Sequence, residues 1–390
     1  MKITARYFFS KLLLLCVSAI FVFISAPAFA EGDETITADS ATENAAPKEK
    51  FNAGKMILDH IGDSHEWHFF TVGKNTISLP LPIILVSSKG IDMFLANRKP
   101  DSVIRLREGI YAAKIGSKYY LIDEGKFSGV VSESDIINRD ITKALDKTVG
   151  VYDLSITKNV LQMLIALSLM MWIIISAAKK YKTRSGKAPR GLQNAVEVIV
   201  LFIRDGVAKP MLGHKYMKYL PYLLSLFFFI LINNLLGLFP AAANVTGNIS
   251  VTATLALLTF ILMMFGSKRH YWVHMVTQPG LPFAVKLLLV PIELISNVLV
   301  KPFALMIRLF ANMLAGHLIV LSFMSIIFIF AAMSVGAGLG ASVFSVAFCI
   351  FIYCLELLVA GLQAYIFTIL TALFISETTA DHSHSDEHAH

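Results

Sequence analysis

The sequence predicts an all-α polytopic membrane protein with five transmembrane helices, one interfacial helix and a small exported module of mixed or β structure at the N-terminus. Of its 390 residues, 56% are hydrophobic and only 16% are charged, whereas a soluble domain carries about 25% charged residues. The apolar excess gathers in runs long enough to span a bilayer. An ordinary soluble enzyme, a disordered chain and a disulfide scaffold are therefore excluded. The net charge of +7 lies beside these runs, as in membrane-facing loops, and does not indicate nucleic-acid binding.

Residues 1–30 have the pattern of a secretory signal peptide. Basic residues precede the apolar stretch Leu12–Ser25, and Ala28-Phe29-Ala30 follows with the small-x-small spacing of a cleavage site. The alternative is an uncleaved membrane anchor. Cleavage places the mature N-terminus outside the cytoplasm.

The next 120 residues divide into a linker and a module. Residues 31–50 are polar and mainly acidic and have no apolar period, which indicates a flexible acidic linker. Residues 51–150 have the composition of a small soluble module, here an extracytoplasmic insert. Alternating runs at Asn75–Leu79 and Tyr119–Ile122 predict short strands within it.

Three histidines of this module are candidate metal ligands. They are His60, His65 and His68. The last two are three positions apart, whereas the helical zinc-protease motif needs four. We therefore interpret these histidines as exposed or packing residues and predict no metal site.

The membrane domain is predicted over residues 151–376. Val160–Ala178 is uncharged and long enough to span. Six basic residues follow within residues 179–190, which marks the cytoplasmic side. Residues 191–208 carry polar groups at roughly helical spacing and predict a helix in the membrane interface.

Four further spans are predicted. Two are of ordinary length, Leu220–Phe239 and Ile249–Gly266. The last two apolar stretches, residues 285–330 and 341–376, are much longer. The first would reach about 68 Å as a helix, roughly twice the hydrocarbon thickness, so it must be tilted, bent or divided.

Three details complete this part of the prediction. Pro302 is a candidate bend in the first long stretch. Residues 336–340, Gly-Ala-Gly-Leu-Gly, are predicted to form an uncharged extracytoplasmic loop between the two stretches. Residues 377–390 are predicted to form a histidine-rich cytoplasmic tail.

Five ionisable residues lie inside the two long stretches: Glu293, Lys301, Arg308, His317 and Glu356. A charge at the bilayer centre costs at least about 2.5–3.5 kcal/mol, so each is a candidate functional residue. For Glu293 and Lys301, near a membrane surface, snorkelling or pairing is an equal alternative. Arg308 lies near the middle of its stretch, which favours function over a structural ion pair.

Helical geometry separates these groups. Arg308 shares a face with Asn312 and with the small residues Ala304, Ala311 and Ala315, so another helix can approach it closely. His317 is nine positions on, about 180° away around the helix. Glu356 and Gln363, seven positions apart, share a face of the last helix. A permanent positive charge and titratable groups on other faces are what a proton route needs.

Two motifs resemble the signatures of a known family. Residues 301–317, KPFALMIRLFANMLAGH, closely resemble a signature of the a subunit of the rotary ATP synthase, and residues 356–368, ELLVAGLQAYIFT, resemble the signature of its last helix. Leu235–Pro240 also fits that family. The resemblance covers about residues 150–376.

The resemblance implies a proton-conducting stator subunit of an F-type ATP synthase, with two half-channels against the c ring. It implies that Arg308 is the essential stator arginine, that Asn312 and Gln363 are its polar neighbours, and that His317 and Glu356 form the acid–base pair of the outer half-channel. Glu293 falls near the family's acidic position, although its spacing to Lys301-Pro302 differs by one residue.

The resemblance also implies the partners and the location. The partners are the c-subunit ring, the b-subunit peripheral stalk, the remaining ATP synthase subunits and the lipid bilayer. The location is a bacterial inner membrane, with the N-terminus periplasmic and the C-terminus cytoplasmic. No cofactor, metal or nucleic acid is expected. ATP chemistry belongs to partner subunits, because no P-loop is present in the sequence. The signal peptide and the insert are departures from the usual family pattern.

Two other function classes are weighed against this one. A stand-alone ion-coupled secondary transporter should contain internal repeats or paired broken helices, and neither is visible. A scaffold or insertase that works through its exported module would leave Arg308, His317 and Glu356 unexplained.

Overall fold

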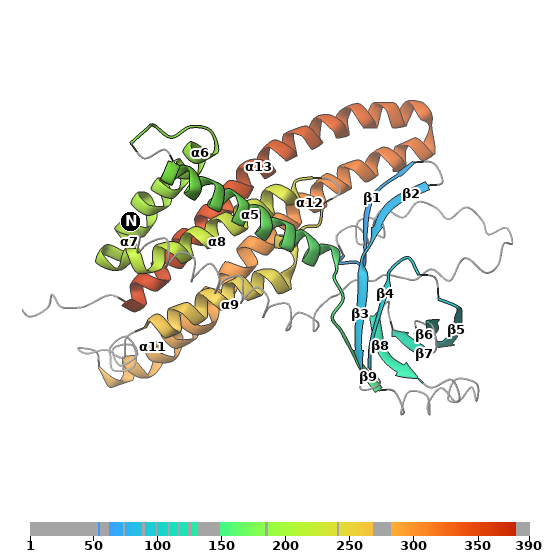
Figure 1. The fold of residues 1–390 in the computed structure, drawn as a ribbon, viewed down its shortest axis with the longest axis horizontal. Helices are drawn as coiled ribbons and strands as arrows, with labels where there is room; N and C mark the ends of the chain where they lie inside the picture. Colours follow the sequence, from blue (N-terminus) through green and yellow to red (C-terminus); the bar gives the residue numbers. More distant parts are fainter. Residues whose placement is uncertain are drawn as a thin grey trace, which may run out of the picture.

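The structure is a computed structural model in which a strand-rich module precedes a bundle of long helices (Figure 1). The described residues are 54, 62–72, 75–87, 90–98, 100–107, 110–115, 118–123, 126–131, 149–183, 186–239, 242–267 and 282–379. The predicted signal peptide, the acidic linker and residues 380–390 of the predicted tail lie outside them.

The described part of the module contains nine strands. They are β1 (Glu66–Val72), β2 (Asn75–Pro80), β3 (Pro82–Ser87), β4 (Gly90–Leu95), β5 (Ser102–Arg107), β6 (Ile110–Ile115), β7 (Lys118–Asp123), β8 (Lys126–Val131) and β9 (Val149–Asp153). β1 and β2 form a hairpin, and the other seven form one sheet in the order β4-β3-β9-β8-β7-β6-β5, with every pair antiparallel. The strands predicted at Asn75–Leu79 and Tyr119–Ile122 are confirmed as β2 and β7.

Alternation along the strands creates the core of the module. Alternate residues of β3 are buried on one side of the curled sheet, and residues 119–122 of β7 are all buried. Three aromatic rings meet in this core. The ring of Phe94 lies 6.2 Å from that of Tyr120 and 6.0 Å from that of Phe127, with edge-on or tilted contacts. Such pairs add to the free energy of burial, so this core holds β4 against β7 and β8.

The module is joined directly to the first long helix, α5 (Lys158–Thr183). The backbone N–H of Lys158 donates to the carbonyl of Ser64 at 2.9 Å, and the N–H of Asn159 donates to Asp63 Oδ1 at 3.3 Å. A helix N-terminus has unpaired N–H groups and a positive dipole end. The module therefore caps α5. Burial raises the pKa of the Asp63 carboxyl and outweighs its hydrogen bonds with Thr157 and Asn159, which lower the pKa.

Acidification is expected to loosen the sheet through Asp92. Lys118 Nζ and the Tyr120 hydroxyl each donate to Asp92 Oδ2 at 2.6 Å. Burial alone would raise the pKa of Asp92, but these hydrogen bonds outweigh it and hold the pKa below its ordinary value. The ionised carboxylate thus stabilises the fold above its unfolded-state pKa of about 3.9, and this contribution is lost as the pH falls through the lower folded-state pKa.

Amide hydrogen exchange in β7 of the full chain measures this effect. Protection, corrected for the intrinsic rate, should fall between about pH 6 and about pH 3. The Asp92→Asn variant should be less protected at neutral pH and should lose most of this pH dependence. Equal protection of the wild-type strand at both pH values would contradict the prediction.

Five helical segments of the described chain are long and apolar enough to cross a membrane, which confirms the predicted fold class. They are residues 158–183, 192–237, 249–266, 285–333 and 335–379. Their regular helices, after α5, are α6 (Leu192–Ile203), α7 (Lys209–Leu212), α8 (Tyr216–Gly237), α9 (Ile249–Gly266), α11 (Phe283–Ile295), α12 (Lys301–Met333) and α13 (Val335–Thr379). Short π or 3-10 turns interrupt them at Arg204–Ala208, Gly213–Lys215, Val245–Gly247 and Ser296–Val300.

The helix predicted at residues 191–208 runs in a different direction from the span that follows. α6 and α7 end at Gly213, whose φ of +51° lies in the left-handed region that favours glycine. The chain then turns into α8 (Figure 1). The position of α6 in the membrane interface stays a prediction, and this change of direction supports it.

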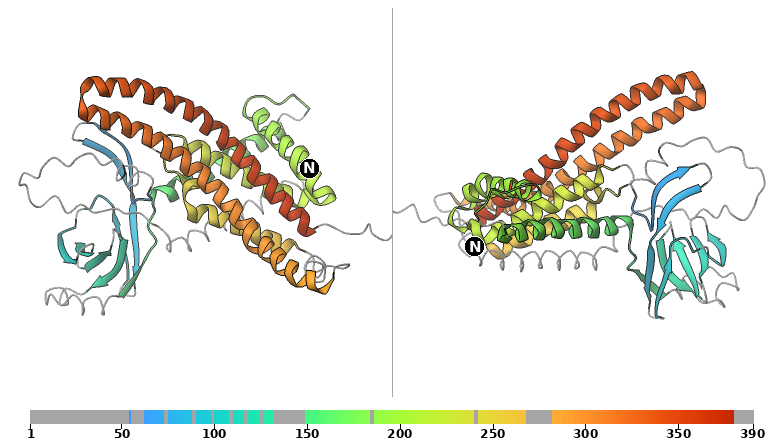
Figure 2. Two further views of the ribbon diagram at one scale, coloured as in Figure 1. Left: turned by 180° about the vertical axis from the view of Figure 1, so that it is seen from behind. Right: turned by 45° about the horizontal axis from the view of Figure 1, so that its top comes forward.

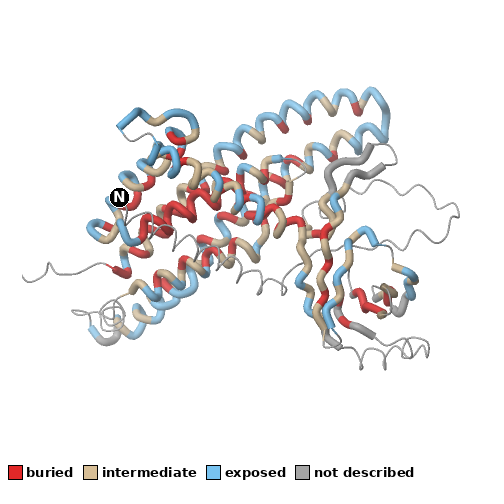
Figure 3. The backbone as a smooth tube through the Cα atoms, in the orientation of Figure 1, coloured by how far each residue is buried: buried red, intermediate tan, exposed pale blue. Residues whose placement is uncertain are grey.

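α8 is the centre of the helical bundle. All ten residues from 221 to 230 are buried, on every side of the helix. Figure 3 shows this buried segment surrounded by the other helices, whereas the far half of the α12–α13 hairpin is mostly exposed. α8 packs against α5 and α13, and α12 packs against α9 and α13. The sequence alone ranks α8 no higher than the other spans, because hydropathy does not separate contact with protein from contact with lipid.

The two longest apolar stretches form a tilted helical hairpin (Figure 2). The first is continuous from Phe283 to Met333, with a π-helical turn at Ser296–Val300 directly before Lys301 and Pro302. The predicted irregularity is thus a π turn, and Pro302 sits in the first turn of α12.

The loop predicted at residues 336–340 is wrong. These residues form the first turns of α13, and the reversal occurs at Ser334, whose backbone is extended. One of the three glycines, Gly338, is needed for close packing. A Cβ on Gly338 would lie 2.8 Å from the Ala331 Cα, so only glycine lets the two helices approach this closely.

Candidate functional site

Arg308 lies on an exposed stripe of α12. The other exposed members of the stripe are Ala304, Ala311, Asn312 and Ala315, whereas Leu305, Leu309 and Met313 are buried on the other side of the helix. The predicted small-residue face is therefore uncovered by the rest of the described chain. None of the described carboxylates forms an ion pair with the guanidinium. A permanent charge among apolar groups in this position needs a partner from elsewhere.

His317 and Glu356 are buried between α12 and α13, away from the Arg308 stripe. Their residues are 8% and 5% exposed. The Glu356 carboxylate packs against Gly316, the neighbour of His317. A Cβ built on Gly316 would lie only 3.0 Å from Glu356 Oε1. The structure thus places the Glu356 carboxylate against the residue before His317, and both predicted titratable residues are buried in the hairpin.

Substituting Gly316 with alanine is expected to displace the Glu356 carboxylate. The added methyl group is too close to Oε1, and overpacking of this kind costs about 1–3 kcal/mol. Proton uptake through the subunit should be slower but should not be lost. The measurement is the rate of ATP-driven acidification of inverted vesicles.

A matched glycine supplies the control for this variant. Gly336 is also helical, although it lies on α13 and not on α12, and a Cβ there would meet nothing within 4 Å. Gly336→Ala should pump at the wild-type rate. Equal rates for the two variants would show that the close fit of Glu356 on Gly316 has no role in proton uptake.

Gln363 is buried on α13, near a polar contact that the sequence did not predict. Gln363 is 4% exposed. Three residues before it, the carbonyl of Ala360 accepts a hydrogen bond from Asn234 Nδ2 on α8 at 3.1 Å. Asn234 Oδ1 is buried and has no hydrogen-bond partner among the described residues. Asn312, by contrast, is exposed on the Arg308 stripe, so the two predicted polar neighbours of Arg308 lie on different surfaces.

A polar loop pins α12 to α5 next to this site. Gln162 on α5 exchanges two hydrogen bonds with Ala243, at 2.5 and 2.6 Å, and Asn244 Nδ2 donates to the carbonyl of Met313 on α12 at 3.1 Å. Sequence reasoning missed Gln162 and Asn244. The available signal was the polar Gln162 inside an apolar run, since a polar group there is buried against protein and must be paired.

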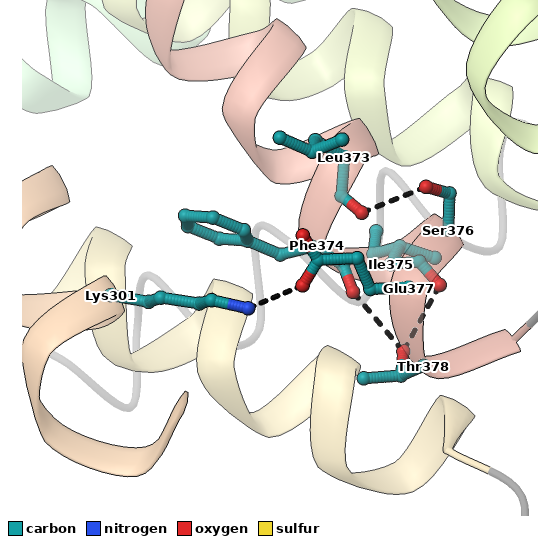
Figure 4. Close-up of polar contacts among 7 residues, drawn as sticks. All are labelled: Lys301, Leu373, Phe374, Ile375, Ser376, Glu377 and Thr378. Carbon is teal, nitrogen blue, oxygen red and sulfur yellow. Dashed lines mark hydrogen bonds and ion pairs between the residues drawn. The ribbon is translucent and has the colours of Figure 1, made fainter. Parts of the chain in front are cut away.

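Lys301 pairs with Glu377, as Figure 4 shows. Its Nζ also lies 5.3 Å from the centre of the Phe374 ring. On the same side, Lys215 Nζ donates to the carbonyl of Thr379 at 2.6 Å. These contacts tie the start of α12 and the start of α8 to the end of α13. Snorkelling and pairing were both considered for Lys301, and the structure shows pairing. Glu377 belongs to α13, which continues to Thr379.

The π turn accounts for the position of Glu293. Eight positions separate Glu293 from Lys301, and the π turn at Ser296–Val300 lies between them. A π turn takes one extra residue into a single helical turn. The half-buried Glu293 is therefore returned to the face of Lys301 despite the extra residue.

Within the described residues, no group of three His, Cys, Asp or Glu side chains is arranged to hold a metal ion. His65 Nε2 lies 3.4 Å from Asp153 Oδ2, in a pair that ties β9 to the residue before β1. Burial alone would raise the pKa of Asp153, but the hydrogen bonds from His65 and Ser155 lower it. His60 and the side chain of His68 lie outside what the structure describes.

Comparison with known proteins identifies the helical part. A family model described as "ATP synthase A chain" matches residues 160–376, and one described as "Domain of unknown function (DUF8433)" matches residues 56–153. "ATP synthase subunit a 2" of Prosthecochloris aestuarii is 46% identical over 248 residues, covering 62% of this chain and 74% of the relative. "ATP synthase subunit a" of Chloroherpeton thalassium is 44% identical over 251 residues, covering 62% and 72%. The matched family model spans more than half of the chain, and the chain therefore belongs to the ATP synthase A chain family.

Proposed function

We propose that this chain is the proton-conducting stator subunit of an F-type ATP synthase, with two half-channels against a ring of c subunits. The observation that carries the proposal is the separation of Arg308 from the His317–Glu356 pair. Arg308 is exposed on a stripe of small residues and has no carboxylate partner in the described chain. His317 is buried on the other side of the same helix, and Glu356 is buried on α13. A rotor carrying carboxylates complements this arrangement.

The uptake side of the mechanism uses the buried pair. A proton arrives from outside the cytoplasm, passes Glu356 and His317, and neutralises one ring carboxylate. Both side chains titrate, so burial and their mutual proximity can hold them ready to exchange protons. The neutral ring site can then enter lipid, where a charged carboxylate would be costly.

The release side of the mechanism uses Arg308. After nearly a full turn, the protonated ring site meets the guanidinium, which stabilises the carboxylate and favours proton loss to the inner half-channel. Arg308 carries a permanent positive charge, as a guanidinium does in proteins. It therefore also blocks direct passage between the half-channels. Each charge that crosses 100 mV supplies about 2.3 kcal/mol, so several protons are needed for each ATP.

The neighbouring polar groups have supporting roles in this proposal. Asn312 lies on the Arg308 stripe and would meet the ring, whereas Gln363 lines the buried side of α13. Glu293, returned to the Lys301 face by the π turn, would serve the inner half-channel. The subunit itself is non-catalytic, and ATP chemistry belongs to the other subunits of the complex.

Copurification tests this function against its rivals. The intact complex, extracted in mild detergent through a tag on this chain, should contain a ring of small hairpin subunits and the b-subunit peripheral stalk. A stand-alone ion-coupled secondary transporter would purify without them and would still move its ion in proteoliposomes. That second result would overturn the proposal.

The proposed location is a bacterial inner membrane, with the N-terminus periplasmic and the C-terminus cytoplasmic. Six basic residues follow α5 within residues 179–190, which favours a cytoplasmic end there. In intact cells, a membrane-impermeant thiol reagent should label Ser102→Cys and leave Ser185→Cys unlabelled. The reverse pattern would show that the orientation is inverted.

A further inference from the structure

One face of the strand-rich module carries only apolar side chains. In the register of β3, Ile84 pairs with Met93, and Val86 pairs with Ile91 on one side and with Tyr152 on the other. Paired residues point to the same face of a sheet. The full set on this face is Pro82, Ile84, Val86, Ile91, Met93, Leu95, Tyr152 and Leu154. We call these eight residues the outer face of the module.

Much of the outer face is exposed among the described residues, most of all on β4 and at Tyr152. Met93 is 68% exposed, Ile91 69% and Tyr152 72%. A sheet face in water normally carries polar residues at alternate positions, and an uninterrupted apolar patch marks an interaction surface. β4 is also an edge strand, a position where exposed apolar residues favour aggregation unless they are covered. The sequence of these strands therefore requires an apolar partner.

The outer face is turned toward α5 and the body of the helical bundle. β5–β8 lie on the far side of β3 and β9 from α5 and α8, whereas the far end of the α12–α13 hairpin extends past these strands (Figures 1 and 2). The core of the module lies between these two layers, where Phe94 meets Tyr120 and Phe127. The outer face is opposite to this core, so it points back toward the layer that the helices cross.

A short hydrogen-bonded connection joins the outer face to the first turn of α5. Only four residues, 154–157, separate β9 from α5. The N–H of Leu154 donates to the carbonyl of Ile84 at 2.9 Å, and the N–H of Ile156 donates to the carbonyl of Pro82 at 3.2 Å. These bonds extend the sheet to the first turn of α5, where Ser64 and Asp63 cap the helix. These hydrogen bonds therefore restrict the orientation of the sheet relative to α5.

The outer face is also continuous with the lipid-facing surface of α5. Leu154 is 37% exposed at the edge of the sheet, and Leu164 and Ile165 are 38% and 43% exposed within the first two turns of the helix. A helix rises 1.5 Å per residue, so these side chains lie about 10 Å beyond its start, within the apolar layer.

We propose that the outer face of the module rests on the lipid bilayer that holds the helices, with Ile91, Met93 and Tyr152 inserted at the boundary between head groups and acyl chains. Amphipathic surfaces bind there through buried apolar area, and tyrosine is favoured at this depth. The module then lies flat on the membrane surface and holds the N-terminal end of α5 in position. This proposal rests on the membrane embedding of the helices and does not depend on proton conduction.

Spin labels in the full chain test the proposal. Cys16, Cys349 and Cys354 are first replaced by Ala, and a nitroxide is attached at Met93→Cys or at Ile91→Cys, so that one misfolded variant does not decide the result. The protein is reconstituted into vesicles of phosphatidylethanolamine and phosphatidylglycerol. Val103→Cys on β5 is the matched control, because Val103 is also exposed but lies on the far side of the module. Leu164→Cys on α5 is the reference for lipid contact.

Collision rates with oxygen, which concentrates in lipid, and with a water-soluble nickel chelate give the result. The oxygen-to-nickel ratio at positions 93 and 91 should be several-fold higher than at 103 and should approach the ratio at 164. A ratio equal to that at 103 would overturn the proposal by showing that water covers the face. Low collision rates with both reagents would overturn it too, since they would show that a protein covers the face.

Discussion

Replacing Arg308 with alanine is expected to abolish ATP-driven proton pumping in a complex that still assembles. The side chain is exposed on α12 and makes no ion pair with the described carboxylates of its own chain, so its removal leaves no buried charge without a partner. What is lost is the positive charge that discharges each ring carboxylate and separates the half-channels. Acidification of inverted vesicles measures pumping, and the proton leak after removal of the catalytic head should rise.

Two further variants sharpen the Arg308 test. Arg308→Lys should also fail, because an ammonium group lacks the planar fork of a guanidinium and can lose its proton when desolvated. Arg204→Ala is the matched control, since Arg204 pairs with Asp205 at 2.7 Å on a different part of the bundle, and it should pump. Coupled pumping by an assembled Arg308→Ala complex would disprove the assignment of Arg308.

Replacing either His317 or Glu356 with alanine is expected to slow proton uptake by about a hundredfold, the smaller end of what a positioned acid–base group contributes. Both residues are buried between α12 and α13, and the Glu356 carboxylate rests against the residue before His317. As the proposed acid–base pair they share one proton route, so the loss of either side chain interrupts it. The initial rate of acidification in inverted vesicles, at equal amounts of assembled complex, measures the effect.

The exchanged variant separates a working pair from two independent residues. His317→Glu combined with Glu356→His keeps both group types at the same point of the hairpin, so it should recover part of the rate lost in the single alanine variants. A double exchange no faster than either single variant would argue against a pair. Normal rates in both single variants would remove these residues from the proton route altogether.

The sequence predicted the helical architecture because bilayer spanning is a local property. About 20 consecutive apolar residues are needed to cross the hydrocarbon layer, and the run from Val160 to Ala178 can be recognised without knowing its neighbours. The stripe beside Arg308 is equally local. Helical periodicity alone places Asn312 and three alanines next to it, and the structure leaves all of them exposed.

The errors and omissions came from contacts between distant segments. The glycines at 336–340 indicated a loop, but these residues are helical, and Gly338 packs closely on Ala331. The partner of Lys301 lies 76 positions away, at Glu377. The backbone contact of Asn234 on α13 joins residues 126 positions apart. Periodicity carries no information on such pairs.

The sequence by itself therefore determined which segments enter the membrane and which residues share a helix face. It also identified the ionisable residues inside the spans as candidate functional residues. Only the tertiary structure decided that α8 is the buried centre, that Glu356 rests on Gly316 beside His317, and that the apolar face of β3, β4 and β9 is turned toward the helices. The physical reason is the range of the forces involved. Hydropathy and helix geometry act over a few residues, whereas helix packing, strand register and the curl of the sheet depend on segments far apart in the chain.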